Sequence, residues 1–493
     1  MVIPMSDETT ERLDNSTRWG LPPEAIADLG SRLRQFWQRF SGCFKTKTHN
    51  AAGHAWAYLQ GLMLMKTGRN FANMDRRVST PEGDGQGLQQ FMSDSPWAAQ
   101  SPIQHVQREI SAPPALQHGG VILLDESSDE KAGAKSAGAG RQHNGRLGKI
   151  EMSQTGVFLA FYKDVVWTWV DGELFLPEHW FTPAMTDERQ RVGVPAERQF
   201  ATKIELGWRM LQRVQTNGLP FEAVACDDLY GRSGWLRHQM DAAGLLYMAE
   251  VPENTLVYLT RPEFGAPPPK AKPRGRKPTR PQALSADPPV PAHQVTQRTA
   301  TPFHRFQVRN TERGELRDPF AMRRVWTIRE DQVAEEWLVI RHEDGQRYTY
   351  ALSNAPADTL HERLAWLKCV RHFAERAHQD AKSETGWDEL QARKYRAWEH
   401  HLALTILATW FIAQTKLDWA NTYARDARLS RQLELATLPA LSVANVRELL
   451  QAVMPLPQLS PEQATRLVVK HLVNRSRSTR SRLQAQRRAP GHT

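Results

Sequence analysis

Apolar residues recur at three- and four-residue spacings along the first part of the chain. Between residues 21 and 40 they occupy Ile26, Leu29, Leu33, Phe36, Trp37 and Phe40. This spacing gathers them on one face of a helix, and the stretch "HAWAYLQGLMLMKTGRNFANM" continues a helical pattern. We therefore predict a disordered N-terminus over residues 1–20 and a helical domain over residues 21–115.

Short β-branched and apolar runs replace the helical spacing after about residue 119. Three of them follow one another as "GGVILLD", "TGVFLAFY" and "VVWTWVDGELFL", separated by polar turns. A helix ending near Gly218, the strand "FEAVACDD", the helix "GWLRHQMDAAG" and the strand "LLYMAEV" come next. The order βββ-α-β-α-β predicts a mixed sheet with packed helices over residues 116–255, and so a multidomain α/β fold class for the chain.

The pattern breaks at "FGAPPPKAKPRGRKPTRPQ" (264–282), which holds six prolines and six basic residues. Proline favours extended backbone and removes hydrogen-bond donors, so this stretch is either a solvated linker or an arm that contacts phosphates. Four strand-like runs follow it, namely "FHRFQVRN", "FAMRRVWTIRE", "EEWLVIRHE" and "RYTYALSN". We predict that residues 256–355 form an insertion made of the arm and a β-rich subdomain.

Helical spacing returns after the insertion. One helix is predicted from Pro356 to Glu384, and the stretch "WEHHLALTILATWFIAQ" is apolar nearly all round, which predicts a second, buried helix. Residues 356–425 would thus complete the domain that begins at residue 116. Residues 426–493 form a helical C-terminal region whose basic tail, "HLVNRSRSTRSRLQAQRRAPGHT", is predicted to be disordered and available to nucleic acid.

The charge balance favours a polyanionic partner. The 493 residues include 64 Lys and Arg against 54 Asp and Glu, a net charge of +10. Nucleic acid is the first candidate partner and an anionic membrane surface the second, and the arginine-bearing helical domain over residues 21–115 fits DNA binding. We expect no membrane span and no secretion signal. The three cysteines lack zinc-ligand spacing, so a reducing cytoplasm is expected.

Three carboxylates are candidate catalytic residues. Asp125 ends the first sheet strand, Asp227 ends "FEAVACD", and Glu375 lies on the helix after the insertion. Neighbouring parallel strands would bring the two aspartates together, and a helix across the sheet would add the glutamate. Such a set suits Mg²⁺ or Mn²⁺, with two ions in a phosphoryl-transfer site. A lone aspartate after a strand is more often a turn or cap residue, so spacing alone leaves both readings open.

The order of three sequence blocks resembles one enzyme family. "VILLDES", followed by "SAGAGRQHNGRLGKIEMSQTGVFLAF" and "DGELFLPEHW", resembles the first-aspartate block of the DDE transposases of bacterial insertion sequences. "VACDDLYGRSGWLR" resembles the second-aspartate block, with Asp227 in the catalytic place. The resemblance is to the group whose ribonuclease-H-like catalytic domain carries a β-strand insertion before its glutamate, and it covers residues 30 to 420.

The third block carries the signature of this group. "KCVRHFAERAHQDAKSETGWDELQAR" resembles its glutamate block, in which Tyr-x2-Arg-x3-Glu-x6-Lys falls on Arg371, Glu375 and Lys382. Lys368 stands in the place of the tyrosine. The resemblance implies that Asp125, Asp227 and Glu375 hold the metal ions. It also implies that Arg371 and Lys382, with Lys368 beside them, contact DNA near the scissile phosphate.

The resemblance further implies an activity and partners. A homodimer would pair two transposon ends, cut at their terminal inverted repeats and join the released 3′-hydroxyls to target DNA. Both the transposon ends and the target would be double-stranded DNA. The protein would work in the bacterial cytoplasm, at the nucleoid. Two alternatives remain: a domesticated or inactive relative that binds DNA without cutting, and a ribonuclease-H-like nuclease that cuts without strand transfer.

Aromatic and basic residues of the insertion are further candidates for DNA contact. Enzymes of this group often cut the second strand through a hairpin, and an aromatic side chain then stacks on a flipped base. Trp326 in "RRVWTIRE" is the candidate for that role, with Trp337 as the alternative and core packing as the plainer explanation for either. Arg323 and Arg324 are candidate phosphate contacts.

The glycine-rich loop "KAGAKSAGAGR" supplies the last candidates. It lacks the GxxxxGK[ST] spacing and does not lead into a helix, which argues against ATP binding. Lys131, Lys135 and Arg141 in this loop are candidate DNA contacts. His400 and His401 are adjacent on an apolar helix and point in different directions, so we interpret them as structural rather than as a shared metal site.

Overall fold

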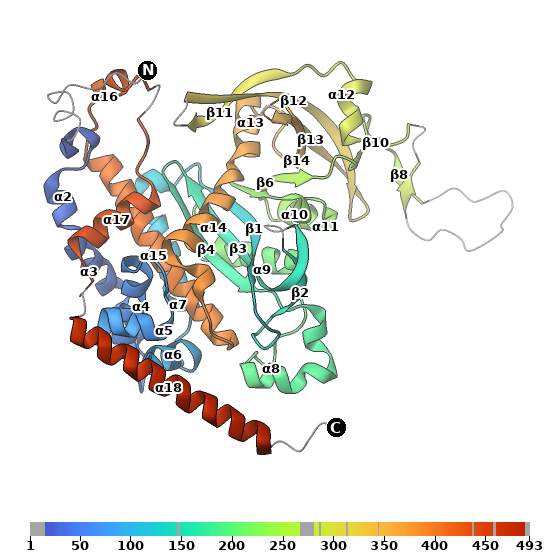
Figure 1. Ribbon diagram of the computed structural model, residues 1–493. Helices are drawn as coiled ribbons and strands as arrows, with labels where there is room; N and C mark the ends of the chain where they lie inside the picture. The colour runs from blue at the N-terminus through green and yellow to red at the C-terminus, as the bar shows by residue number, and fades with distance from the viewer. Residues whose placement is uncertain are drawn as a thin grey trace.

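The computed structural model describes residues 15–488 apart from 145–147, 267–280, 285–286, 312–313, 344, 436–437 and 457–459. N-terminal and C-terminal helices pack side by side against a central sheet, and the inserted strands lie at the far end of that sheet (Figure 1). Most of the predicted basic arm falls on residues 267–280, outside the described residues.

The first region is helical, as predicted. Its main helices are α2 (Pro23–Ala27), α3 (Leu29–Phe40), α4 (Ala52–Leu64), α5 (Phe71–Met74), α6 (Gln86–Ser93) and α7 (Gln100–Ser111). The prediction of disorder over residues 1–20 is wrong for residues 15–20. A short 3-10 helix, η1 (Ser16–Trp19), is capped by the Asn15 side chain. Arg18 pairs with Asp426 at 2.9 Å, which holds this turn on the C-terminal region; residues 1–14 lie outside the described residues.

The core of the fold is a mixed ten-stranded sheet with the order β11-β12-β13-β14-β6-β5-β1-β3-β2 and with β4 paired to β3. Its first part comprises β1 (Val121–Glu130), β2 (Gly140–Asn144), β3 (Lys149–Lys163), β4 (Val166–Leu174), β5 (Ala223–Cys226) and β6 (Leu246–Val251). The β1–β5 and β5–β6 pairs are parallel, while β3 is antiparallel to β1 and β4 is antiparallel to β3. This arrangement confirms the predicted α/β fold class with a mixed sheet.

The insertion contributes the four strands that its sequence predicts. They are β11 (His304–Thr311), β12 (Gly314–Arg329), β13 (Gln332–Glu343) and β14 (Arg347–Ser353). Strand β14 pairs with β6 in the register Tyr350↔Val251 to Ser353↔Met248. The insertion therefore extends the same sheet instead of forming a separate one. Short pieces connect it: β7 (Leu256–Val257), β8 (Phe264–Gly265), β9 (Gln282–Ala283), β10 (Val290–Pro291) and α12 (Val295–Arg298).

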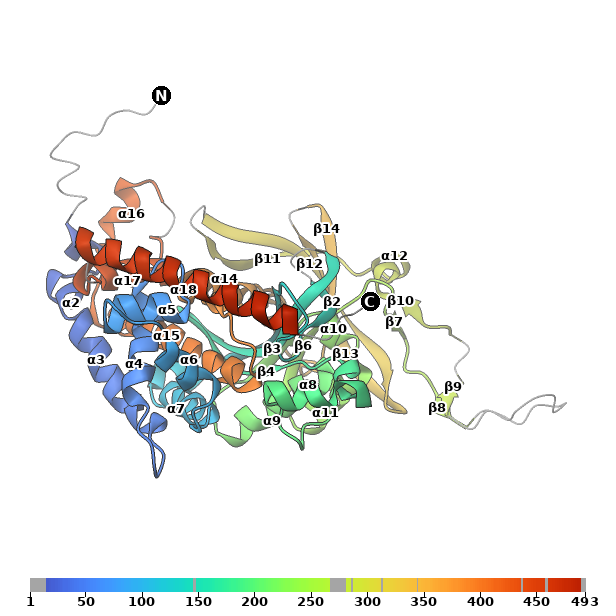
Figure 2. The same ribbon diagram turned by 60° about the horizontal axis from the view of Figure 1, so that its bottom comes forward.

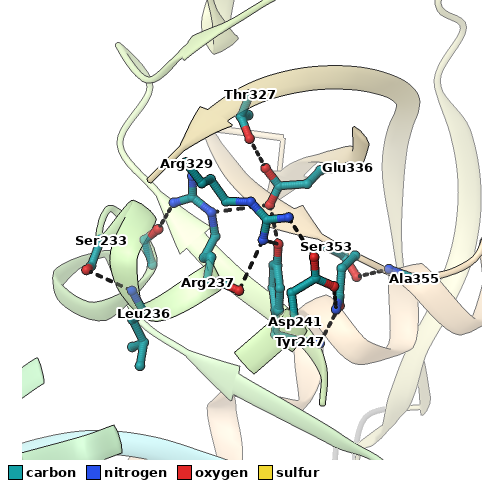
Figure 3. Close-up of polar contacts among 12 residues, drawn as sticks. Ser233, Leu236, Arg237, Asp241, Tyr247, Thr327, Arg329, Glu336, Ser353 and Ala355 are labelled. Atoms are coloured by element: carbon teal, nitrogen blue, oxygen red, sulfur yellow. Dashed lines mark hydrogen bonds and ion pairs between the residues drawn. The ribbon is translucent and has the colours of Figure 1, made fainter. Parts of the chain in front are cut away.

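A buried ion-pair network joins the insertion to strand β6 of the first part of the sheet (Figure 3). Glu336 of β13 is fully buried, accepts hydrogen bonds from Tyr247 of β6 and Thr327 of β12, and pairs with Arg237 at 3.2 Å. Arg329 of β12 donates to the Tyr247 hydroxyl at 2.7 Å. Because α11 (Gly234–Ala242) supplies Arg237 and β6 supplies Tyr247, these contacts fix the insertion relative to the first part of the sheet. We call these five residues the joint network.

Helices cover the sheet, and one prediction needs correction. Helices α8 (Thr186–Val192), α9 (Lys203–Thr216), α10 (Asp228–Gly231) and α11 (Gly234–Ala242) follow the first strands. The single helix predicted from Pro356 to Glu384 is in fact two, α13 (His361–Val370) and α14 (His372–Thr385), with Arg371 between them. Neither proline nor glycine marks this break. It coincides with the residue whose guanidinium is held by Glu250 of β6, at 3.0 Å.

The long helix α15 (Tyr395–Thr422) is buried nearly all round, as predicted, and lies between the N-terminal helices and strand β4 (Figure 2). Helices α16 (Arg428–Gln432), α17 (Val443–Val453) and α18 (Pro461–Arg488) follow. The prediction of a disordered basic tail over residues 471–493 is wrong for residues 471–488, which continue helix α18 without interruption by proline or glycine. Within the described residues, no helix is long and apolar enough to cross a membrane.

His400 and His401 have structural partners. His400 contacts the carbonyl oxygens of Met92 and Trp97 at 2.9 and 3.0 Å. The Nδ1 atom of His401 lies 2.9 Å from the hydroxyl of Tyr58, and its Nε2 atom lies 3.0 Å from the carbonyl oxygen of Trp387. These contacts tie α15 to the N-terminal helices, and they confirm the structural interpretation.

We expect His401 to make a contribution to stability that is lost below pH 6.5. Burial lowers the pKa of His401 from 6.5 to about 3. Between these pH values, the imidazole is protonated in the unfolded chain but neutral in the folded protein. Its contribution is present above pH 6.5 and is lost as the pH falls, by about 2 kcal/mol between pH 6.5 and 5. Chemical denaturation of the wild type and of His401→Gln at both pH values measures this loss as a difference, in which the contributions of other titrating groups cancel. The His401→Gln variant should show a shallower pH dependence by the same amount, and an unchanged slope would contradict the assignment.

Candidate active site

Strand register brings two of the predicted carboxylates side by side. Leu124 of β1 pairs with Cys226 of β5, and Cys226 pairs with Ala249 of β6, all in parallel. The next residue along each strand is therefore acidic: Asp125, Asp227 and Glu250. The expectation that Asp125 ends its strand is wrong. Strand β1 leaves β5 there but continues along β3 to Glu130.

Burial and neighbouring negative charges raise the pKa values of the two aspartates. Asp125 is 9% exposed and Asp227 is half-buried. Burial raises the pKa of both carboxyl groups, helped by the charge of Asp227 acting on Asp125 and that of Glu126 acting on Asp227. Adjacent, poorly solvated carboxylates are suited to a hard divalent cation, which would favour their ionised forms.

Asp227 combines a structural and a candidate chemical position. It is the N-cap of α10, and its Oδ1 atom accepts hydrogen bonds from the backbone N–H groups of Leu229 at 3.1 Å and Tyr230 at 3.4 Å. The cap occupies one oxygen and orients the carboxylate beside β1. The cap reading and the ligand reading of this residue are thus compatible.

Arg371 connects Asp125 to Glu375. Its Nη1 atom lies 3.8 Å from Asp125 Oδ2, and its Nη2 atom lies 2.9 Å from Glu375 Oε1. The Glu375 side chain, in the first turn of α14, is 59% exposed. As the side chains stand, no group of three His, Cys, Asp or Glu residues in the described ranges is close enough together to hold a metal ion. The role of the three acids as metal ligands therefore stays a prediction.

The two lysines of the signature have internal partners. The Lys368 side chain is 1% exposed, and its ammonium contacts Glu250. Lys382 pairs with Asp129 of β1 at 2.9 Å and donates to the carbonyl oxygen of Ser128 at 3.1 Å. Both lysines thus fasten the α13–α14 pair of helices to the sheet.

The insertion candidates lie on β12 and β13. Trp326 is half-buried, and its backbone pairs with that of Tyr258 at 2.8 and 2.9 Å. Trp337 is 7% exposed and donates from its indole to the carbonyl oxygen of Pro356, as expected of a core residue. Arg324 pairs with Glu335 at 3.0 Å, and Arg323 is half-buried. A stacking role for Trp326 stays a prediction.

The glycine-rich loop leads into β2. Lys135 and Arg141 are exposed, which suits a contact with DNA, whereas Lys131 is partly buried with its ammonium 3.4 Å from the carbonyl oxygen of Leu390. The DNA-contacting roles of these residues stay predictions.

Two residues beside the acids were not anticipated. Glu250 follows "LLYMA" just as Asp227 follows "FEAVAC", so the end of a third predicted parallel strand was the signal that could have identified it. His378 lies one turn beyond Glu375, with its Nε2 atom 3.9 Å from Asp125 Oδ2. Among the residues that the structure describes, neither ring nitrogen of His378 has a hydrogen-bond partner, and burial lowers the pKa of His378 to about 3.

Gly231 allows the second-aspartate loop to approach β6. A Cβ atom at this position would lie 1.8 Å from the backbone oxygen of Glu250. We expect Gly231→Ala to destabilise the protein by about 1–3 kcal/mol and to slow any reaction at this site, because backbone cannot yield as a side chain does. Gly234→Ala is the matched control, since its nearest neighbour would be 3.9 Å away. Denaturant unfolding of both variants checks this, and equal stabilities would contradict the close-approach argument.

Comparison with known proteins supports the sequence resemblance. The family model described as "DDE superfamily endonuclease" matches residues 39–315, a range that includes Asp125 and Asp227 but ends before Glu375. A relative from Microchaete diplosiphon, "Probable transposase for insertion sequence element IS701", is 27% identical over 154 residues. That match covers 30% of this chain and 36% of the relative, so the chain spans about a third of the length of the relative. Because the family match extends over more than half of the sequence, the chain belongs to the DDE superfamily of endonucleases.

Proposed function

We propose that this protein is a transposase that cuts DNA at the terminal inverted repeats of its element and joins the 3′-hydroxyl ends to target DNA. The observation that carries the proposal is the placement of Asp125 and Asp227 at one level of two neighbouring parallel strands. The family match and the transposase relative support the same reading.

Asp125 and Asp227, with Glu375 from α14, are the residues that would hold Mg²⁺ or Mn²⁺. The donor set fits, because oxygen ligands suit hard cations, and Asp125 is buried and Asp227 half-buried, with the pKa of both carboxyl groups raised. Two such ions supply activation of an attacking oxygen and stabilisation of a leaving oxygen in phosphoryl transfer. Adding divalent cation should then stabilise the protein, an effect that the Asp227→Asn variant should lose.

Other residues of the site would bind and orient DNA. Arg371 carries a planar guanidinium beside the acids, which suits contact with the phosphate next to the scissile bond. Lys382 holds strand β1 through Asp129, and so positions Asp125 four residues earlier on the same strand. Lys135 and Arg141, the helical domain over residues 21–115 and the basic arm would bind the duplex beyond the site. A homodimer would hold two ends together.

The test uses a duplex that carries the inverted repeat found in the DNA flanking the gene. Purified protein with Mg²⁺ should nick this duplex at the end of the repeat and leave a 3′-hydroxyl, whereas EDTA should abolish nicking. Precut ends should then join a supercoiled plasmid. Binding without nicking would favour the inactive relative, and nicking without joining would favour the nuclease without strand transfer.

A further inference from the structure

Glu250 stands in the same row as the two catalytic aspartates, yet its partners differ from theirs. It is the residue that follows Ala249, the register partner of Cys226, so it lies at the end of the third parallel strand. Its side chain is 22% exposed. One carboxylate oxygen contacts the ammonium of Lys368, and the other lies 3.0 Å from the Nε atom of Arg371.

These contacts pair the Glu250 carboxylate with two cationic side chains of the protein. Burial alone would raise the pKa of Glu250, but Lys368 and Arg371 lower that pKa below its ordinary value. Glu250 therefore remains ionised with both oxygens engaged. Asp125 and Asp227, by contrast, have raised pKa values. A carboxylate that is already neutralised by two cations is a poor ligand for a metal ion and a good anchor for an arginine.

The geometry of Arg371 shows what this anchor accomplishes. The guanidinium is planar, so an ion-pair contact at Nε restricts the directions of both Nη atoms. With Nε on Glu250, Nη1 faces Asp125 at 3.8 Å and Nη2 faces Glu375 at 2.9 Å. Glu250 on β6 thus orients the guanidinium of Arg371 between Asp125 and Glu375.

We propose that Glu250 is a positioning residue, which fixes the guanidinium plane of Arg371 so that its outer N–H groups meet the phosphate beside the scissile bond. Lys368 is then the buried counter-charge that keeps Glu250 in place, instead of a DNA contact. The role of the DNA phosphate in this assignment rests on the proposed function. The orientation of Arg371 by Glu250 rests on the contacts described above.

A double-mutant cycle tests the proposal. In Glu250→Gln the shape is retained but the charge is lost. Single-turnover cleavage at saturating DNA should then slow by about 10²-fold, the scale of a misplaced group, with end binding nearly unchanged. In an Arg371→Ala background, Glu250→Gln should cause little further loss. Lys368→Met removes the counter-charge that keeps Glu250 in place, so it should also slow cleavage, by less than Glu250→Gln, because the contact with Arg371 remains. Glu222→Gln is the matched control: it removes the carboxylate that Arg363 of α13 contacts at 3.2 Å, before the start of β5, and should leave the cleavage rate unchanged.

Two outcomes would overturn the assignment. One is a Glu250→Gln enzyme that cleaves at the wild-type rate. The other is a Glu250→Gln effect that is equally large with and without Arg371, which would indicate a structural role for Glu250. A readout independent of activity is the arginine Nε–H signal of Arg371 in NMR, assigned by its loss in Arg371→Lys. Its solvent exchange should be slow in the wild type and fast in Glu250→Gln. If the wild type does not nick DNA at all, the proposed function fails, while this signal still decides whether Glu250 orients Arg371.

Discussion

Replacing Asp227 with asparagine should abolish DNA nicking while leaving the fold intact. Asparagine is nearly isosteric and is an equally good N-cap, so the hydrogen bonds to Leu229 and Tyr230 can persist. What disappears is the negative charge beside Asp125. We expect nicking to fall by about 10³-fold or more, the scale of losing a group that stabilises charge in the transition state. The measurement is the rate of Mg²⁺-dependent nicking of an end-containing duplex.

Asp228→Asn is the control for this experiment. Asp228 is the next residue, its side chain is 51% exposed, and it pairs with Arg232 one turn along the chain. An exposed pair of this kind contributes little to stability, so this variant should nick DNA at nearly the wild-type rate. If Asp227→Asn retained nicking and Asp228→Asn lost it, Asp228 would have to take the catalytic place.

The largest expected effect on stability is that of Glu336→Ala in the joint network. This change leaves Arg237, which is 4% exposed, without its carboxylate partner, and removes the acceptor of Tyr247 and Thr327. An unpaired charge in the interior costs about 3–5 kcal/mol. Because the joint network connects β12 and β13 to β6 and α11, the loss should appear as cooperative destabilisation of the insertion and of α11 in hydrogen exchange.

Glu335→Ala provides the comparison for that loss. Glu335 lies on the opposite face of β13 from its neighbour Glu336. It is exposed and pairs with Arg324 of β12. Its removal should cost no more than about 1 kcal/mol. Urea denaturation of the two variants gives both values. Similar values for Glu335→Ala and Glu336→Ala would mean that the buried network does not hold the insertion in place.

The elements with strong periodicity were predictable from the sequence alone. Short β-branched and apolar runs indicated β1, β3, β4, β5 and β6 and the four strands of the insertion, whereas β2 was not predicted. The apolar stretch after Lys394 indicated the buried helix α15. The pairing of β14 with β6 was not predictable. The sequence pattern shows that a strand has an apolar face, but not which neighbouring strand pairs with the backbone N–H and C=O groups at its edge.

The candidate site was predictable in part. The strand-plus-aspartate pattern and the ordered blocks indicated Asp125 and Asp227, which strand register brings together. The break at Arg371 was not foreseen, because it coincides with an ion pair to Glu250, which lies 121 residues earlier in the chain on β6, and not with proline or glycine. The sequence also could not show that Lys368 and Lys382 are engaged by Glu250 and Asp129, since such pairing depends on tertiary contact.

The pairing of β14 with β6 has a consequence for any attempt to shorten the protein. The insertion covers the β6 edge with main-chain hydrogen bonds over residues 248–251. Deleting it would uncover that edge beside the catalytic strands, and an uncovered edge is a template for intermolecular β-pairing. A minimal catalytic fragment made this way should therefore aggregate, whereas replacing β11 to β14 with a single designed capping strand should keep it monodisperse.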